Sequence, residues 1–182
     1  MPETYAAAYA AWQESPERWW AEAAAGIAWD QPWSRVFDPA QGPFGRWFPG
    51  ARLNTAYNCL DRHIEAGRGD QPALIWDSAM EDRVETFTYR VLRDRVAKVA
   101  GALAALGVRA GDRVVLYMPM VPEAAIAMLA SARLGAVHSV VFGGFAAAEL
   151  AARIADAKPR VIVSASCGLE PGRVVAYKPL LD

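Results

Sequence analysis

The sequence predicts an α/β fold, and two features of its second half carry that prediction. Short runs of β-branched and other apolar residues at 114–118, 137–142 and 160–164 are typical of buried strands. The segments between them, 122–134 and 146–156, carry apolar residues at helical spacing. Strands that alternate with helices form parallel sheets that helices cover on both faces, with right-handed crossovers. We therefore expect a strand–helix–strand–helix–strand unit built on a mainly parallel sheet.

The first fifty residues have a different character, because they are rich in tryptophan and proline. The alanine-rich segment 5–13 predicts a helix, and Ser15 followed by Pro16 and Glu17 predicts the start of a second. Residues 30–53 contain many prolines and glycines, which predicts an irregular segment. We expect its aromatic side chains to pack onto the body of a larger protein. A surface that stacks sugars or bases is the alternative, but no polar motif accompanies it.

Local signals place the elements in between. Residues 56–66 predict a helix that ends at Gly67, and segments 73–77 and 84–88 predict paired strands across a polar turn. Thr88 is expected to cap a helix that ends at Gly107. Its apolar stripe is too short for a coiled coil, so we expect it to dock on a sheet; the stripe comprises Leu92, Val96, Val99, Leu103 and Leu106. On the helix over 122–134, the residues expected to face inward are Ala125, Met128, Leu129 and Ala132.

Composition excludes several function classes. The chain has 182 residues, 54% of them hydrophobic, and a net charge of −1, which gives no basic surface for nucleic acid or acidic membranes. The longest uncharged apolar run in the body is too short to cross a bilayer, and the first residues show no secretory signal. Two cysteines and two histidines lack the spacing of metal ligands; they are Cys59, Cys167, His63 and His138. We expect free thiols, a cytoplasmic location and no metal site.

Two loops carry the candidate site. The sequence VVFGGF at 140–145 follows one predicted strand, and SASCGLEPGR at 164–173 follows the next. The carboxyl ends of parallel strands share one edge of a sheet, where ligands bind in open α/β sheets. Glycines allow backbone N–H groups to approach an anion, and an arginine can bind a phosphate with two parallel hydrogen bonds. We therefore expect the diglycine turn and Arg173 to converge on one patch.

These residues also carry a family resemblance. The stretches GAVHSVVFGGF and ARIADAKPRVIVSASCGLEPGRVVAYKPLLD resemble the short-chain acyl-CoA synthetases that form acyl-adenylates. The second stretch is more similar to propionyl-CoA synthetases than to acetyl-CoA synthetases. Residues 53–63 resemble the segment that precedes the adenylating domain of this family. Residues 86–89 (TFTY) and 111–114 (GDRV) resemble the opening of that domain.

The resemblance implies a helical, tryptophan-rich extension over 1–67, followed over 68–182 by the first βαβαβ part of the large adenylating domain. The family's Ser/Thr/Gly-rich phosphate loop and its catalytic lysine do not occur here, so we expect an amino-terminal piece without catalytic residues. The parent would use ATP with Mg²⁺ to convert a short-chain carboxylate, preferably propionate, to an acyl-adenylate and transfer the acyl group to CoA. The rest of the same polypeptide would be its partner, and the isolated piece would be inactive and could self-associate through exposed apolar surface.

The resemblance further assigns part of a CoA nucleotide site to Phe142, Gly143, Gly144 and Arg173. A tight strand-to-helix turn and a surface arginine are the alternative interpretations. Glu170 stands where acetyl-type relatives often carry a second arginine, so their CoA geometry does not transfer unchanged.

Further interpretations concern single residues and alternative functions. Ala146 stands where the family commonly has a serine after GGF, and this removes a side-chain cap. His138 is expected to be a hydrogen-bonded core histidine and Cys167 an unreactive thiol.

A non-catalytic module that binds a nucleotide-containing ligand or a partner is the alternative function. A dinucleotide-binding fold is disfavoured because no G-x-G-x-x-G follows a predicted strand.

Overall fold

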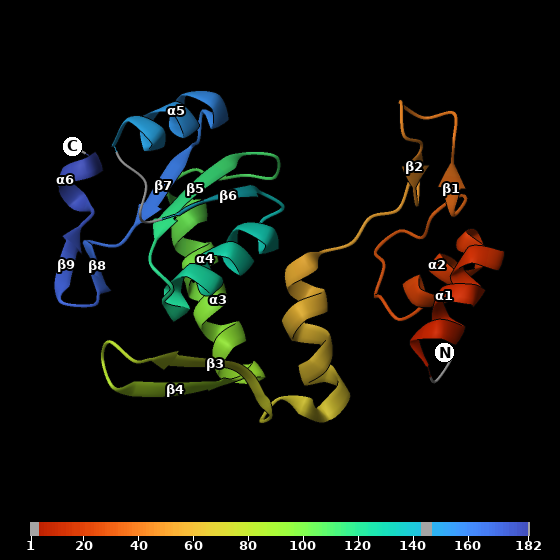
Figure 1. Ribbon diagram of the computed structural model, residues 1–182, viewed down its shortest axis with the longest axis horizontal. Coiled ribbons are helices and arrows are strands. Elements are labelled where there is room, and N and C mark those ends of the chain that lie inside the picture. Colours follow the sequence, from red (N-terminus) through yellow and green to blue (C-terminus); the bar gives the residue numbers. More distant parts are fainter. Residues whose placement is uncertain (1–3, 143–146, 182) are drawn as a thin grey trace. The chain divides into compact units, whose positions relative to one another are not determined.

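The computed structural model describes residues 4–142 and 147–181, except for the side chain of Phe142 (Figure 1). It separates into two compact units, Met1–Asn54 and Thr55–Asp182. The expected domain boundary between residues 67 and 68 lies inside the second unit, and it remains a prediction about the family's domains. Each unit is described by itself.

The first unit begins with the two predicted helices. Helix α1 spans Tyr5–Glu14, and the Thr4 hydroxyl caps it by accepting a hydrogen bond from the amide of Ala7 at 3.3 Å. Helix α2 spans Pro16–Ala24. Ser15 occupies its N-cap position as expected, but the hydroxyl makes no capping hydrogen bond. The start of α2 therefore rests on Pro16, whose ring presets a helical φ angle.

The rest of the first unit is irregular, as its prolines and glycines predict. It contains the two-residue strands β1 (Phe37–Asp38) and β2 (Arg46–Trp47), which pair antiparallel. The rings of Trp29, Trp33 and Phe48 lie within 5.1–5.7 Å of one another, centroid to centroid. These aromatic side chains thus pack on each other inside the unit. Their packing onto the body of a larger protein stays a prediction.

The second unit opens with a helical segment over residues 56–68 that is wider than an α-helix. It consists of two π-helical turns, η1 (Tyr57–Asp61) and η2 (Ile64–Arg68), with Leu60 buried on the inner side. Gly67, expected to end the helix, adopts φ +78° and interrupts it. The helical prediction is confirmed, whereas the wide hydrogen-bonding pattern had no signal in the residue spacing.

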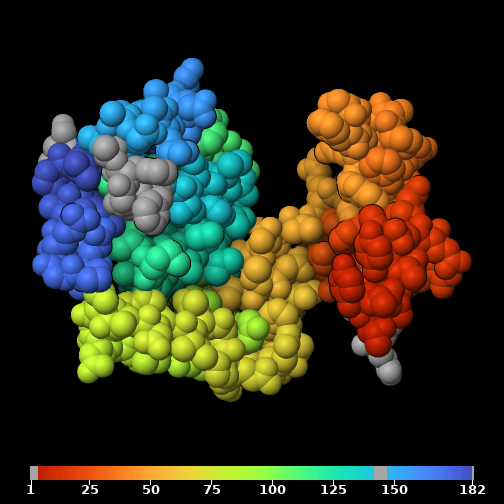
Figure 2. Space-filling view, in the orientation of Figure 1, coloured from red at the N-terminus to blue at the C-terminus, as the bar shows by residue number. Residues whose placement is uncertain are grey.

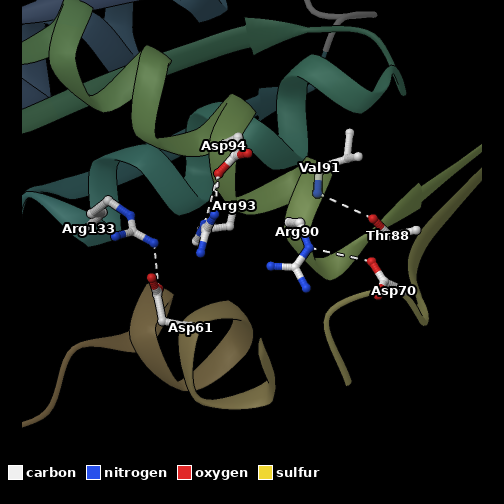
Figure 3. A network of polar contacts seen from close by, with 8 residues as sticks. All are labelled: Asp61, Asp70, Thr88, Arg90, Val91, Arg93, Asp94 and Arg133. Carbon is white, nitrogen blue, oxygen red and sulfur yellow. Dashed lines mark hydrogen bonds and ion pairs between the residues drawn. The ribbon is translucent and has the colours of Figure 1, made fainter. Parts of the chain in front are cut away.

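A hairpin and a long helix follow as predicted. Strands β3 (Pro72–Ser78) and β4 (Arg83–Thr88) pair antiparallel, and helix α3 spans Tyr89–Ala105. The Thr88 hydroxyl caps α3 by accepting a hydrogen bond from the amide of Val91 at 3.3 Å (Figure 3).

The apolar stripe of α3 is buried over most of its length. Leu92, Val96 and Leu103 are buried, and Val99 is half-buried. Leu106 is 62% exposed, which contradicts the prediction. It lies past the end of the helix, where Gly107 at φ +87° turns the chain away.

The described residues contain a parallel sheet with strand order β6-β5-β7, which confirms the α/β prediction. Its strands are β5 (Arg113–Met118), β6 (Val137–Phe142) and β7 (Val161–Ser164). Helices α3 and α4 (Pro122–Arg133) pack against one face, and α5 (Ala147–Ala157) packs against the other (Figure 1).

Strand β5 forms the centre of the core. Val114 and Leu116 point into the cluster that includes residues of α3 and α4, while Val115 and Tyr117 point into the cluster with Leu150 of α5. All four of these β5 side chains are at most 1% exposed. The continuous apolar run in the sequence therefore reflects burial on both faces of the strand.

The inward face of α4 differs from the prediction. The most deeply buried positions of this helix are Pro122, Ile126, Ala127, Ala130 and Ser131. The predicted residues, Ala125, Met128, Leu129 and Ala132, are half-buried instead. Helix α4 contacts α3 as well as β5 and β6, so its buried arc is set by two partners and not by a single sheet face.

Residues after β7 form a hairpin where the sequence suggested a loop. Strands β8 (Cys167–Glu170) and β9 (Arg173–Ala176) pair antiparallel, and the short helix α6 (Lys178–Leu181) follows. The Tyr177 ring lies 4.8 Å from the Tyr117 ring, and its backbone amide donates to the Ser166 carbonyl at 2.9 Å. These contacts hold the base of the hairpin against the sheet.

No helix among the described residues has the length and hydropathy needed to span a membrane.

Candidate functional site

The two strands that precede the candidate loops end at the same edge of the sheet. In the parallel register, Met118 of β5 pairs with Phe142 of β6, and Tyr117 pairs with Ser164 of β7. The segments that follow β6 and β7 therefore both leave from the carboxyl edge, as the sequence predicted. Gly143 and Gly144 lie outside the described residues, and so does the Phe142 side chain; their ligand role stays a prediction.

Arg173, the fourth predicted residue, lies at the tip of the β8–β9 hairpin. It pairs across the strands with Glu170, and Pro171 and Gly172 form the turn between them. Gly172 adopts φ +74°, a conformation that glycine reaches at little cost. The Arg173 side chain is 70% exposed, so its guanidinium is open to solvent at this tip.

Glu170 binds Arg173 through two contacts that the sequence did not predict. The Arg173 Nε donates to Glu170 Oε2 at 2.7 Å, and Nη2 lies 2.5 Å from the same oxygen. The Glu170 side chain is 41% exposed. Spacing alone could have suggested the pair, because the two residues flank a Pro-Gly turn and thus face each other in a hairpin.

The hairpin is held by close packing around Gly168 and Tyr177. A Cβ atom added at Gly168 would lie 2.5 Å from the Tyr177 hydroxyl oxygen, so a side chain there would displace the ring. Tyr177 is only 5% exposed and cannot move aside freely. Burial raises the pKa of both Tyr177 and Tyr117, so both phenols stay neutral at physiological pH.

A cavity of about 380 Å³ opens beside the hairpin, at the carboxyl end of β5. Its walls come from three segments, residues 76–81, 119–121 and 167–169. The Trp76 indole N–H donates to the Met120 carbonyl at 2.8 Å, which fixes the β3–β4 hairpin to the loop after β5. In Figure 2 the β3–β4 hairpin (yellow-green) lies next to the C-terminal segment (blue). The cavity lies where ligands bind in α/β sheets.

Charged side chains attach the π-helical segment to α4 and the residues just after it to α3 (Figure 3). Arg133 of α4 forms an ion pair with Asp61 of η1 at 2.5 Å, and both side chains are largely shielded from solvent. Arg90 of α3 reaches Asp70 at 3.4 Å, which is a longer and more exposed contact. This network is structural, and none of its members lines the cavity.

The remaining titratable candidates are one histidine and the two cysteines. His138 is half-buried on β6, and its Nδ1 has no hydrogen-bond partner, so the hydrogen bond expected of a core histidine is not seen at that atom. Cys59 and Cys167 are free thiols, as predicted. Residues 4–142 and 147–181 contain no group of three or more His, Cys, Asp or Glu side chains placed to hold a metal ion.

Family comparisons agree with this architecture. The model for the acetyl-coenzyme A synthetase N-terminus matches residues 5–59, and the AMP-binding enzyme model matches residues 60–178. The chain belongs to the family of AMP-binding enzymes.

Curated relatives define the branch within that family. Acyl-CoA synthetase short-chain family member 3, mitochondrial, of Homo sapiens is 48% identical over 98% of the chain, which covers 26% of that protein. Acetyl-coenzyme A synthetase of Streptomyces coelicolor is 50% identical over 90% of the chain and 25% of that protein. An uncharacterized protein of Pseudomonas aeruginosa is 55% identical over 98% of the chain and 28% of that protein. The chain thus spans about a quarter of the length of the curated relatives it matches, which are short-chain acyl-CoA or acetyl-CoA synthetases where their names state an activity.

Proposed function

We propose that this chain serves as the amino-terminal part of a full-length AMP-forming synthetase that activates a short-chain carboxylate, preferably propionate. In the first step the carboxylate attacks the α-phosphorus of ATP, which yields acyl-adenylate and pyrophosphate. In the second step the CoA thiol attacks the acyl carbon and AMP leaves. This chain contributes scaffold and part of the CoA nucleotide site and no catalytic residue. The proposal keeps the predicted domain division between residues 67 and 68 and a cytoplasmic location, which free thiols suit.

The observation that carries the proposal is the shared carboxyl edge of β6 and β7. Phe142 ends β6, and the β8–β9 hairpin with Arg173 follows β7 after two intervening residues. Arg173 at the tip of that hairpin has an exposed guanidinium, whose paired N–H donors would suit a CoA phosphate that displaces Glu170. The backbone N–H groups of Gly143 and Gly144 would add donors at the start of α5.

ATP would bring Mg²⁺, whose charge offsets that of the phosphates during adenylate formation. The described residues offer no cluster of acidic or histidine side chains to hold the ion, so we assign no Mg²⁺ ligand to them.

The CoA role is tested with Arg173→Ala in the full-length synthetase. Loss of a charge-assisted contact at an exposed position should raise the KM for CoA about 5- to 30-fold, because such a contact contributes roughly 1–2 kcal/mol. Acid-dependent pyrophosphate exchange, which reports adenylate formation, should stay nearly unchanged. Arg18→Ala on α2 is the matched control, because Arg18 is also an exposed arginine paired with a glutamate. Equal loss of both half-reactions, or an unchanged KM for CoA, would contradict the proposed role.

The same assays test the remaining parts of the proposal. A higher kcat/KM for acetate than for propionate would remove the propionate preference, which rests on the likeness of residues 164–182 alone. Pyrophosphate exchange by residues 1–182 alone would contradict the assignment of the chemistry to the rest of the polypeptide.

A further inference from the structure

The β8–β9 hairpin also carries an acidic side chain, Glu170, which binds Arg173. Cross-strand neighbours in a hairpin point to the same face, so the turn itself places Glu170 beside Arg173. One carboxylate oxygen, Oε2, accepts a hydrogen bond from Nε of the guanidinium and forms an ion pair with Nη2. The pair is therefore built into the backbone geometry and is not a chance approach of two flexible side chains.

The contact occupies a part of the guanidinium that a phosphate would use. The edge formed by Nε and Nη2 is one of those that can hold two oxygens in parallel, and the Glu170 carboxylate already binds it. A phosphate that approaches this edge must displace the carboxylate. A phosphate that approaches the Nη1 end instead meets a guanidinium whose positive charge the bound carboxylate already offsets.

We propose that Glu170 competes with the CoA phosphate for Arg173 and so weakens CoA binding. The inference rests on the proposed function, because it requires that Arg173 contact CoA. Both side chains are substantially exposed, which keeps the ion pair weak enough for a phosphate to displace it. Glu170 thus sets the affinity for CoA without preventing binding.

The test compares Glu170→Gln with the native full-length synthetase in steady-state assays that vary CoA. The amide keeps the shape of the side chain and removes its charge. We expect the KM for CoA to fall by up to about fivefold, which corresponds to the upper end of the range measured for exposed ion pairs, with the KM for ATP and the rate of pyrophosphate exchange unchanged. Glu22→Gln is the matched control, because Glu22 is an exposed glutamate that binds Arg18 at 2.9 Å, and it should leave the KM for CoA unchanged.

Salt provides a second readout that a merely structural role would not move. The screening length falls from about 10 Å at 0.1 M salt to about 3 Å at 1 M. The ratio of the two KM values should therefore shrink toward one as salt rises. A ratio that stays constant would mean that Glu170 acts through the shape of the turn and would overturn the inference.

The double variant separates the inference from the function on which it rests. In an Arg173→Ala background, Glu170→Gln should have no effect on the KM for CoA, because the competed group is gone. The same drop in both backgrounds would overturn the inference, since Glu170 would then act on CoA directly.

If Arg173→Ala raises the KM and Glu170→Gln leaves it unchanged, the proposed function stands and the inference fails. If Arg173→Ala has no effect, the CoA role of Arg173 fails and the inference fails with it.

Discussion

Each of the two units of this chain is stabilised internally by a different kind of contact. Among the described residues of the first unit, only Ala24 and Pro49 are buried, and the unit's larger contacts are between partly exposed aromatic rings. In the second unit, strand β5 is buried on both faces and is the common wall of two apolar clusters. Small units bury a smaller fraction of their surface, so the first unit has less hydrophobic stabilisation available per residue.

The comparison teaches where substitutions should matter. Aromatic pairs contribute about 0.5–1.5 kcal/mol each beyond the area they bury, and they tolerate adjustment because rings can tilt. A side chain of β5 is enclosed on all sides, so its loss leaves a cavity that the structure cannot fill. The stability of the second unit is thus concentrated in a few positions, whereas that of the first is spread over many rings.

The largest expected effect is that of Leu116→Ala in β5. Leu116 is 1% exposed, so its truncation should lower the free energy of unfolding by about 2–5 kcal/mol. Phe44→Ala is the counterpart in the first unit, and since Phe44 is 91% exposed its effect should stay within about 0.5 kcal/mol.

Urea unfolding can follow the two units separately. Six of the seven tryptophans lie in the first fifty residues, so fluorescence reports mainly on the first unit, while far-UV circular dichroism also follows the second. A larger effect from Phe44→Ala than from Leu116→Ala would reverse the comparison.

An intermediate effect is expected from the two helix caps. The Thr88 hydroxyl binds the amide of Val91, so Thr88→Ala should cost about 1 kcal/mol of unfolding free energy. Ser15 occupies the same position on α2 without a capping hydrogen bond, so Ser15→Ala should cost no more than a few tenths of a kcal/mol. Denaturant unfolding of both variants measures the difference. Equal losses would show that cap identity matters more than the hydrogen bond.

The smallest effect concerns pH and His63. Burial of the ring, reinforced by the positive charges of Arg68 and Arg62, lowers the pKa of His63 below 6.5. The ring also lies 4.9 Å from that of Tyr89. The folded state therefore favours neutral imidazole, and the unfolded state takes up a proton more readily as pH falls.

The contribution of neutral His63 to the free energy of unfolding is complete above about pH 6.5. It is lost as the pH falls from there toward the lower pKa of His63 in the folded state. Unfolding measured between pH 8 and pH 5.5 should show a slope that His63→Gln reduces. An unchanged slope in that variant would assign the pH dependence to other groups.

Several local features follow from residues that lie next to each other in the chain. The strand runs at 114–118 and 137–142 and the cap at Thr88 are all found where the sequence predicts them. Glycines at positive φ end helices for the same local reason, as Gly107 does. Each of these signals depends on the intrinsic preferences of a few residues, so no distant partner is needed to interpret it.

Other features depended on contacts between distant segments. The buried face of α4 differs from the predicted one because the helix packs on α3 as well as on the sheet. The spacing of apolar residues within α4 does not reveal either contact. The hairpin at 167–176 is held against the sheet by the contact of Tyr177 with Tyr117, which lies sixty positions earlier in the chain.

The sequence was sufficient to predict the fold class, the succession of helices and strands along the chain, and the family. These depend on local residue preferences and on motif content. The cavity beside Trp76 required coordinates, whereas the pairing of Glu170 with Arg173 could have been suggested by their spacing about one Pro-Gly turn. The cavity arises where separate backbone segments meet, and the position of such a meeting is set by packing across the whole unit and not by any single stretch of residues.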